Sequence, residues 1–328
     1  MKKKVIVTGG AGFIGSHLVD KLVNQKYDVL VIDNLVNGQI KNLSKSYKKI
    51  KFIKADIRNF KKIEKYFKGV AIVFHLAALA DIVPSIKEPE SYYSTNVTGT
   101  LNVLMLCKKY QVKKIIYSAS ASCYGISKEI PTSESSKLSP EYPYALTKKL
   151  GEDLIIHWGK VYKLNYTSLR LFNVYGPRSR TTGAYGAMFG VFLAQKISNK
   201  PFTVVGNGSQ KRDFTFVKDI VEVMVKCLKK KQSNNEIFNV GTGVPISVNE
   251  ITKLLGGKKI YIPKRPGEPN TTVANIKKIK KNLNWKPKIN ITNGVNILLN
   301  NINMWSNAPI WDKKSISKAT KDWFKHLK

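Results

Sequence analysis

Short runs of apolar and β-branched residues recur along the first half of the chain, separated by longer segments of mixed polarity. The runs predict buried strands at 4–9, 27–33, 49–55, 71–77, 113–119 and 166–173. The mixed segments predict helices at 16–26, 96–110 and 144–162. Because strands that are apolar on both faces must be covered on both sides, this alternation predicts an α/β fold with a doubly wound parallel sheet.

The pattern changes after residue 173, where turn-forming residues become frequent. A helix is predicted at 187–198, and loops are predicted at 239–243 and 265–269. We expect a large domain over 1–173 that regains a segment of about 207–242. The remaining segments, 174–206 and 243–328, are expected to form a smaller, discontinuous C-terminal lobe over one end of the sheet.

Composition narrows the classes of protein that this chain can be. The 328 residues carry a formal charge of +35, but the basic residues are mostly lysines scattered along the chain. This distribution favours a lysine-rich surface over a specific nucleic-acid site, which needs a concentrated basic face. The three cysteines and four histidines show no metal-binding spacing, so we expect no metal and a reducing, cytoplasmic location. No apolar stretch reaches the ~18 residues of a membrane span.

The first predicted strand runs into the glycine-rich sequence VIVTGGAGFIG. Gly9, Gly12 and Gly15 would allow a tight turn, close approach of a pyrophosphate and close packing of the following helix. Asp33 ends the second predicted strand, where its carboxylate can accept the ribose hydroxyls of NAD and repel the 2′-phosphate of NADP. Turn glycines and a capping aspartate are the structural alternative. In this context the pattern favours a Rossmann domain that binds NAD.

Tyr144 and Lys148 form a YxxxK pair, a spacing that recurs elsewhere in this lysine-rich chain. Only at Tyr144 does a long helical pattern begin, with Pro143 at its entrance. A lysine ammonium one turn away would favour the phenolate and bring the tyrosine pKa of about 10 toward working pH. Tyr144 could then remove a proton from a substrate hydroxyl. A half-buried tyrosine beside a solvated lysine is the alternative interpretation.

Further blocks extend the pattern along the chain. They are HLAA (75–78), TNVTGT (95–100), SASASCYG (118–125), YPYALTK (142–148), RLFNVYGPR (170–178), RDFTFV (212–217), NVGTG (239–243) and RPGEP (265–269). With the glycine-rich start, they resemble the extended short-chain dehydrogenase/reductase family, the NAD-dependent sugar-nucleotide epimerases and dehydratases. Within it, the chain looks most like UDP-glucose 4-epimerases and their N-acetylhexosamine relatives.

The resemblance implies roles for individual residues. Ser120 matches the residue that hydrogen-bonds the sugar 4-hydroxyl, Tyr144 matches the base, and Lys148 matches the lysine that holds the nicotinamide ribose. The implied NAD-binding set is Gly9, Gly12, Phe13, Ile14, Gly15, Asp33, Asn34, Asp56, Ile57, Leu76, Ala77, Ala78, Asn96, Tyr144 and Lys148. The implied substrate-binding set is Ser120, Asn173, Arg212, Arg265, Glu268 and Thr272.

The residues after Ser120 bear on which reaction is expected. Relatives that dehydrate their substrate carry an Asp-Glu pair where this chain has Ala121 and Ser122, and neither of these can act as a carboxylate acid or base. We therefore expect 4-epimerisation of a UDP-hexose, UDP-N-acetylhexosamine or UDP-uronic acid through a 4-keto intermediate. A dehydratase or decarboxylase of the same family, or a non-catalytic NAD- or RNA-binding protein, is the alternative.

Two finer expectations also follow from the resemblance. Thr272 matches a position where a bulky tyrosine restricts some relatives to plain hexoses, so a threonine would admit a 2-N-acetyl group. The helices at 96–110 and 144–162 match those through which family members form homodimers. Leu150, Leu154 and Ile155 are candidate contacts there, although they could face the sheet instead.

Overall fold

The computed structural model describes residues 3–179 and 188–327. Its largest feature is a sheet of seven parallel strands in the order β10-β6-β5-β4-β1-β2-β3. The strands are β1 (Lys4–Thr8), β2 (Asp28–Asp33), β3 (Lys51–Lys54), β4 (Ile72–His75), β5 (Lys114–Ser120), β6 (Asn165–Leu171) and β10 (Glu236–Val240). The predicted doubly wound parallel sheet is thus confirmed. The prediction of a loop at 239–243 was partly wrong, because Asn239 and Val240 belong to β10 and pair with β6.

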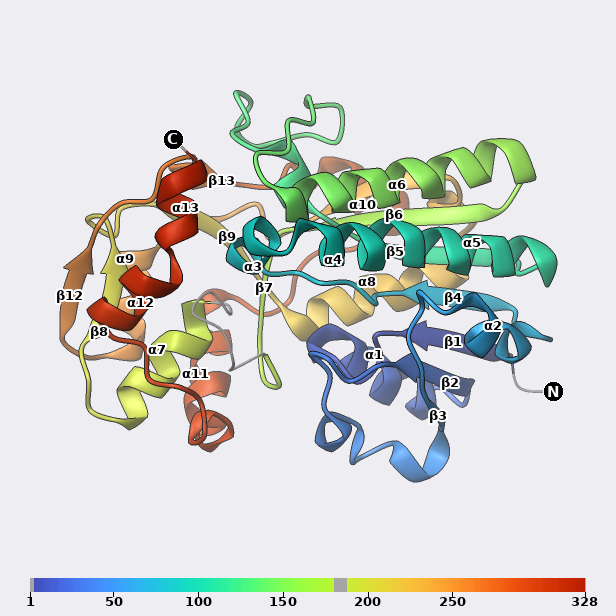
Figure 1. The fold of residues 1–328 in the computed structure, drawn as a ribbon, viewed down its shortest axis with the longest axis horizontal. Coiled ribbons are helices and arrows are strands. Elements are labelled where there is room, and N and C mark those ends of the chain that lie inside the picture. The colour runs from blue at the N-terminus through green and yellow to red at the C-terminus, as the bar shows by residue number, and fades with distance from the viewer. Residues whose placement is uncertain (1–2, 180–187, 328) are drawn as a thin grey trace.

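Helices cover both faces of this sheet, as Figure 1 shows. One face packs against α1 (Phe13–Asn24), α8 (Val217–Lys229) and α10 (Lys277–Leu283). The other packs against α2 (Phe60–Glu64), α5 (Gly99–Lys109) and α6 (Pro143–Tyr162). The predicted helices at 16–26 and 144–162 are confirmed within a few residues. The one predicted at 96–110 is α5 with a π-helical turn, Ser94–Thr98, before it.

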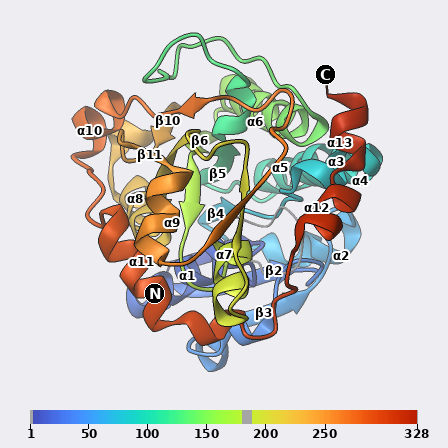
Figure 2. The same cartoon turned by 90° about the vertical axis from the view of Figure 1, so that its left-hand side faces the viewer.

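A smaller lobe lies beyond the carboxyl ends of the sheet strands (Figure 2). One of its sheets contains β7 (Asn173–Tyr175), β9 (Lys211–Phe216), β11 (Pro245–Ser247) and β13 (Thr271–Thr272), and another pairs β8 (Phe202–Val205) with β12 (Lys259–Ile262). Its helices include α7 (Met188–Ile197), α9 (Val248–Leu255), α11 (Ile291–Asn300), α12 (Lys313–Ala319) and α13 (Lys321–His326). An aromatic-rich core, with Tyr175 stacked on Phe189 at 4.8 Å between ring centroids, joins these elements. The exact limits of the two domains stay a prediction.

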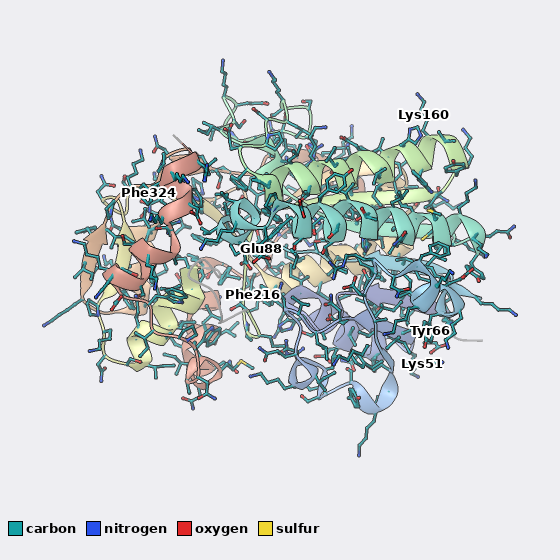
Figure 3. The ribbon with its side chains drawn as sticks, viewed as in Figure 1. Lys51, Tyr66, Glu88, Lys160, Phe216 and Phe324 are labelled. Atoms are coloured by element: carbon teal, nitrogen blue, oxygen red, sulfur yellow. The ribbon has the colours of Figure 1, made fainter. Side chains whose placement is uncertain are left out.

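The connections between strands supply the remaining helices near the cleft. They are α3 (Ile82–Lys87) and α4 (Pro89–Tyr93), which follow β4 and lie against α6. Lysine side chains project from the surface on many sides, and Lys51 and Lys160 are examples labelled in Figure 3. No helix among the described residues is long and apolar enough to cross a membrane.

Candidate active site

A cavity of about 590 Å³ lies between the carboxyl ends of the parallel strands and the smaller lobe. Gly9 follows β1, Asp33 ends β2, Ala77 follows β4, Ser120 ends β5 and Asn173 follows β6, and all of them line this cavity. Parallel strands present their carboxyl ends at one sheet edge, so residues far apart in the sequence meet there. The lobe closes the opposite side of the cavity with residues from the ends of β9 and β13 and from the loop before β13.

The glycine-rich turn before α1 leaves room that a side chain would fill. Gly9 has a φ of +69°, and a Cβ atom there would lie 2.7 Å from the backbone nitrogen of Ala77. A Cβ atom on Gly15 would clash with the carbonyl oxygen of Gly9. The turn therefore lies close against the segment that follows β4, and the first residues of α1, Phe13 to Gly15, line the cavity. This arrangement can hold a pyrophosphate.

Asp33 is held in place by backbone donors. Its Oδ2 accepts a hydrogen bond from the N–H of Ala11 at 2.9 Å, and its Oδ1 accepts one from the N–H of Leu35 at 2.8 Å. Burial raises the pKa of this carboxyl, and the two hydrogen bonds oppose that effect. Gly38 passes so close that a Cβ atom would lie 2.8 Å from Oδ1. The carboxylate is thus fixed at the cavity wall, where it can accept ribose hydroxyls.

Tyr144 and Lys148 lie one turn apart at the start of α6, which begins at Pro143, and both line the cavity. Burial raises the pKa of Tyr144 to about 12, and hydrogen bonds with Ser120 and Ser122 act in the opposite direction. The side chain of Lys148 is 4% exposed, and burial lowers its pKa to about 8. In this structure the serine hydroxyls therefore favour the phenolate of Tyr144.

The Lys148 ammonium lies over an aromatic ring instead. Its Nζ is 4.4 Å from the centroid of Tyr117, whose hydroxyl donates to the carbonyl oxygen of Lys148 at 3.3 Å. Such a contact stabilises a desolvated cation by about 1–2 kcal/mol. Tyr117 therefore holds the lysine in position at the cavity wall while leaving it protonated below about pH 8.

The lobe contributes a charged cluster. Glu268 Oε1 lies 3.0 Å from Arg212 Nη2 and 3.7 Å from Arg265 Nη1, and all three residues line the cavity. One carboxylate between two guanidinium groups leaves a net positive charge, which suits a diphosphate. Thr272 lies on the same wall, and its buried Oγ1 has no hydrogen-bond partner among the described residues.

Two of the predicted NAD-binding residues do not line this cavity. Asp56 binds Arg58, with Oδ2 2.8 Å from Nη2, and also accepts from Asn34, and the Arg58 hydrogen bond lowers its pKa to about 2. Asn96 is 1% exposed and exchanges two hydrogen bonds with the backbone of Leu79, at 2.8 and 3.0 Å. Asn96 thus fixes the loop after β4 through the backbone of Leu79, without lining the cavity itself. For both residues, direct cofactor contact stays a prediction.

The cavity also contains residues that the sequence did not single out. Tyr142 stacks on Tyr144 with ring centroids 6.4 Å apart and planes at 10°. Tyr142 is the extended N-cap residue of α6, two residues before Tyr144. Asp81 and Trp323 also line the cavity. Nothing local in the sequence indicated Trp323, which comes from α13 near the end of the chain.

Comparison with known proteins places this geometry in context. The profile of the NAD dependent epimerase/dehydratase family matches residues 5–241. A UDP-glucuronate 4-epimerase of Thermodesulfobacterium geofontis is 36% identical, over 95% of this chain and 98% of its own, and a UDP-glucose 4-epimerase of Lactobacillus helveticus is 35% identical, over 87% and 92%. The structure of a UDP-N-acetylglucosamine 4-epimerase from Methanobrevibacter ruminantium M1 matches with a TM-score of 0.86 at 32% identity, over 92% of this chain and all of that one. The chain belongs to the NAD-dependent epimerase/dehydratase family.

Proposed function

We propose that this protein is an NAD-dependent 4-epimerase of a UDP-sugar. The observation that carries the proposal is the convergence of Ser120, Tyr144 and Lys148 at one cavity wall, with no carboxylate at Ala121 or Ser122. Dehydration of the intermediate would need an acid and a base at those positions. The relatives named above, which act on three different UDP-sugars, support the same reaction.

The cavity residues have separate roles in the proposed reaction. Tyr144 removes the proton of the sugar 4-hydroxyl, and Ser120 and Ser122 stabilise the phenolate and the developing oxyanion by hydrogen bonding. Lys148 adds a fixed positive charge on the same wall. NAD, which the glycine-rich turn and Asp33 would hold, would supply the reversible hydride chemistry at C4 of the sugar. Arg212 and Arg265 hold the diphosphate, so that the sugar can turn while the nucleotide stays bound.

The sugar is set by the wall that contains Thr272. A threonine leaves space beside the sugar that a bulkier side chain would fill, so an N-acetyl group fits this wall. UDP-N-acetylhexosamines and plain UDP-hexoses are therefore the first substrates to try, with UDP-uronic acids next.

The test is a panel of UDP-, GDP- and dTDP-sugars incubated with the NAD-loaded protein, with products identified by NMR and mass spectrometry. We expect the C4 epimer of a UDP-sugar with no change in mass. Tyr144→Phe serves as the inactive control, because it removes the acid-base hydroxyl and keeps the ring. A product 18 mass units lighter, identified as a 4-keto-6-deoxy sugar, would contradict epimerisation.

We also propose that the protein forms a homodimer in the cytoplasm through α5 and α6. Ile155 faces the sheet, because it is fully buried in the core under α6, so it is not a contact. Met105 on α5 and Leu146 on α6 are 44% and 46% exposed and offer an apolar surface. Light scattering after size-exclusion chromatography should give twice the mass of the chain. Leu146→Glu should halve the mass, and the control Ile126→Glu, at a loop residue that is 54% exposed, should leave it unchanged.

A further inference from the structure

The last helices of the chain cross from the smaller lobe to the large domain. We call residues 311–326 the C-terminal strap, and it lies outside the 5–241 segment that the family profile matches. At one end, the carbonyl oxygen of Trp311 accepts a hydrogen bond of 2.6 Å from Nε2 of Gln195, which is buried in α7 of the smaller lobe. At the other end, α13 packs against α3 of the large domain (Figure 1). There Lys87 Nζ lies 3.5 Å from Asp322 Oδ2.

Trp323 is the residue that the strap inserts into the cleft. It is 2% exposed, and it lines the cavity. Its indole N–H donates to the carbonyl oxygen of Pro266 at 2.8 Å, and its ring centroid is 5.6 Å from the guanidinium carbon of Arg265. On its other side, the ring centroid of Tyr142 is 6.2 Å away. Trp323 therefore lies between the arginine cluster and the aromatic pair Tyr142–Tyr144.

Trp323 lies next to where the sugar ring of a bound UDP-sugar would be. A UDP-sugar with its phosphates at the arginines and its 4-hydroxyl at Tyr144 must place the sugar ring between them. A cation over an indole face is held by about 1–2 kcal/mol when the contact is shielded from water. The indole N–H fixes the segment that carries Arg265 through the Pro266 carbonyl.

We propose that Trp323 is a substrate-binding residue, and that it also positions Arg265 for the diphosphate. Through it, the C-terminal strap completes the sugar-nucleotide site from outside the family's matched segment. The inference rests on the proposed function only for the identity of the sugar. Trp323 assists the binding of a nucleoside diphosphate, and this binding can be measured without turnover.

The experiment compares Trp323→Ala, Trp323→Phe and the matched control Phe324→Ala in the NAD-loaded protein. Phe324 is the next residue of α13, is 41% exposed and does not line the cavity (Figure 3). We expect Trp323→Ala to raise the KM for the UDP-sugar about tenfold or more with kcat within about threefold, because ground-state binding is lost. Trp323→Phe keeps a ring over Arg265 and should show a smaller rise, and Phe324→Ala should match the wild type.

Calorimetric titration with UDP separates this proposal from the assigned reaction. The Kd for UDP should rise about tenfold in Trp323→Ala, whether or not the wild type turns over any of the sugars offered. Quenching of tryptophan fluorescence by UDP should disappear in Trp323→Phe and persist in Trp311→Phe, which keeps the strap's backbone anchor. If Trp323→Ala does not fold, the loss or persistence of fluorescence quenching by UDP in Trp323→Phe tests the proposal by itself. Unchanged KM, UDP affinity and UDP quenching in the Trp323 variants that fold would overturn the proposal.

Discussion

The hydroxyl oxygens of Ser120 and Ser122 lie 2.8 Å apart, and both side chains lower the pKa of the Tyr144 phenol against the effect of its burial. Ser120 ends β5, and Ser122 lies in the 3-10 turn Ala121–Tyr124 that follows. The backbone N–H of Ser122 donates to Ser120 Oγ at 3.2 Å, so the turn itself sets the geometry of the pair. A phenolate at Tyr144 therefore has two neighbouring donors, which compensate part of the cost of burying its charge.

Removing these two hydroxyls should lower turnover to different extents. A hydrogen bond to a charged group contributes about 1.5–3 kcal/mol, so we expect Ser120→Ala to lower kcat about 10- to 100-fold. Ser122→Ala should have a smaller effect, because Ser122 lowers the pKa of Tyr144 less than Ser120 does. The double variant should fall below either single one in steady-state assays. A Ser122→Ala protein with wild-type kcat at every pH would show that Ser120 acts alone.

Asp33 should decide between the two dinucleotides. Its carboxylate is fixed at the cavity wall by two backbone donors, so it cannot move away from a 2′-phosphate. In a binding titration, we expect the wild type to bind NAD at least about 100-fold more tightly than NADP. Placing the 2′-phosphate of NADP beside the Asp33 carboxylate would cost several kcal/mol, because the two groups carry like charges. Asp33→Asn should narrow that ratio. Asp28→Asn, at the exposed opposite end of β2, should leave it unchanged. Equal wild-type affinities would contradict this role of Asp33.

Thr272 should control the size of the sugar. A tyrosine there would fill the space beside the cavity wall, so Thr272→Tyr should lose turnover of UDP-N-acetylglucosamine and keep turnover of UDP-glucose. Thr272→Val keeps the size and removes a buried hydroxyl that has no partner among the described residues, so it should leave the KM of both sugars within about twofold. The measurement is kcat/KM for both sugars in all three proteins. An equal loss for the two sugars in Thr272→Tyr would rule out a size gate.

The large domain could be predicted because its strands are buried on both faces. Each strand is then an apolar run that is recognisable by itself, as in VIVT before Gly9, and the glycine turn and the end of β2 follow from it. Strand β10 was not predicted as a strand, because its end at Asn239 and Val240 is short and continues into turn residues. What makes it a strand is pairing with β6, which is distant in the sequence.

The lobe and its share of the site depended on contacts that no local pattern records. β13 is the two-residue strand Thr271–Thr272, defined by its pairing with β9. Arg212, Arg265 and Glu268 could be proposed only through the resemblance, and the structure adds that the carboxylate pairs with both guanidinium groups. Trp323 lies on a six-residue helix with an ordinary polar pattern, and only the path of the C-terminal strap brings it to the cavity.

Lys148 should make the protein less stable at neutral pH than it would be without this charge. Burial lowers the pKa of Lys148 to about 8 in the folded protein, whereas an unfolded lysine titrates near about 10.4. Below pH 8 both states bind the proton, and the cost of burying the ammonium is fully present. Between about pH 8 and 10.4 the unfolded state binds more protons, so this contribution makes the folded state more stable as pH rises.

Lys148→Met should therefore raise the free energy of unfolding of the NAD-free protein at pH 7 by about 1–3 kcal/mol, since each pKa unit is worth about 1.4 kcal/mol. The gain should shrink through pH 9 and vanish near pH 10.5, although turnover is lost at every pH. Urea unfolding of both proteins at these pH values measures the difference, and the buried Lys114, whose pKa is also lowered to about 8, contributes equally to both. Lys149→Met, on the more exposed side of α6, should show no such pH-dependent gain. A Lys148→Met protein that is less stable than the wild type at pH 7 would mean that the ammonium contributes more through Tyr117 than it loses by burial.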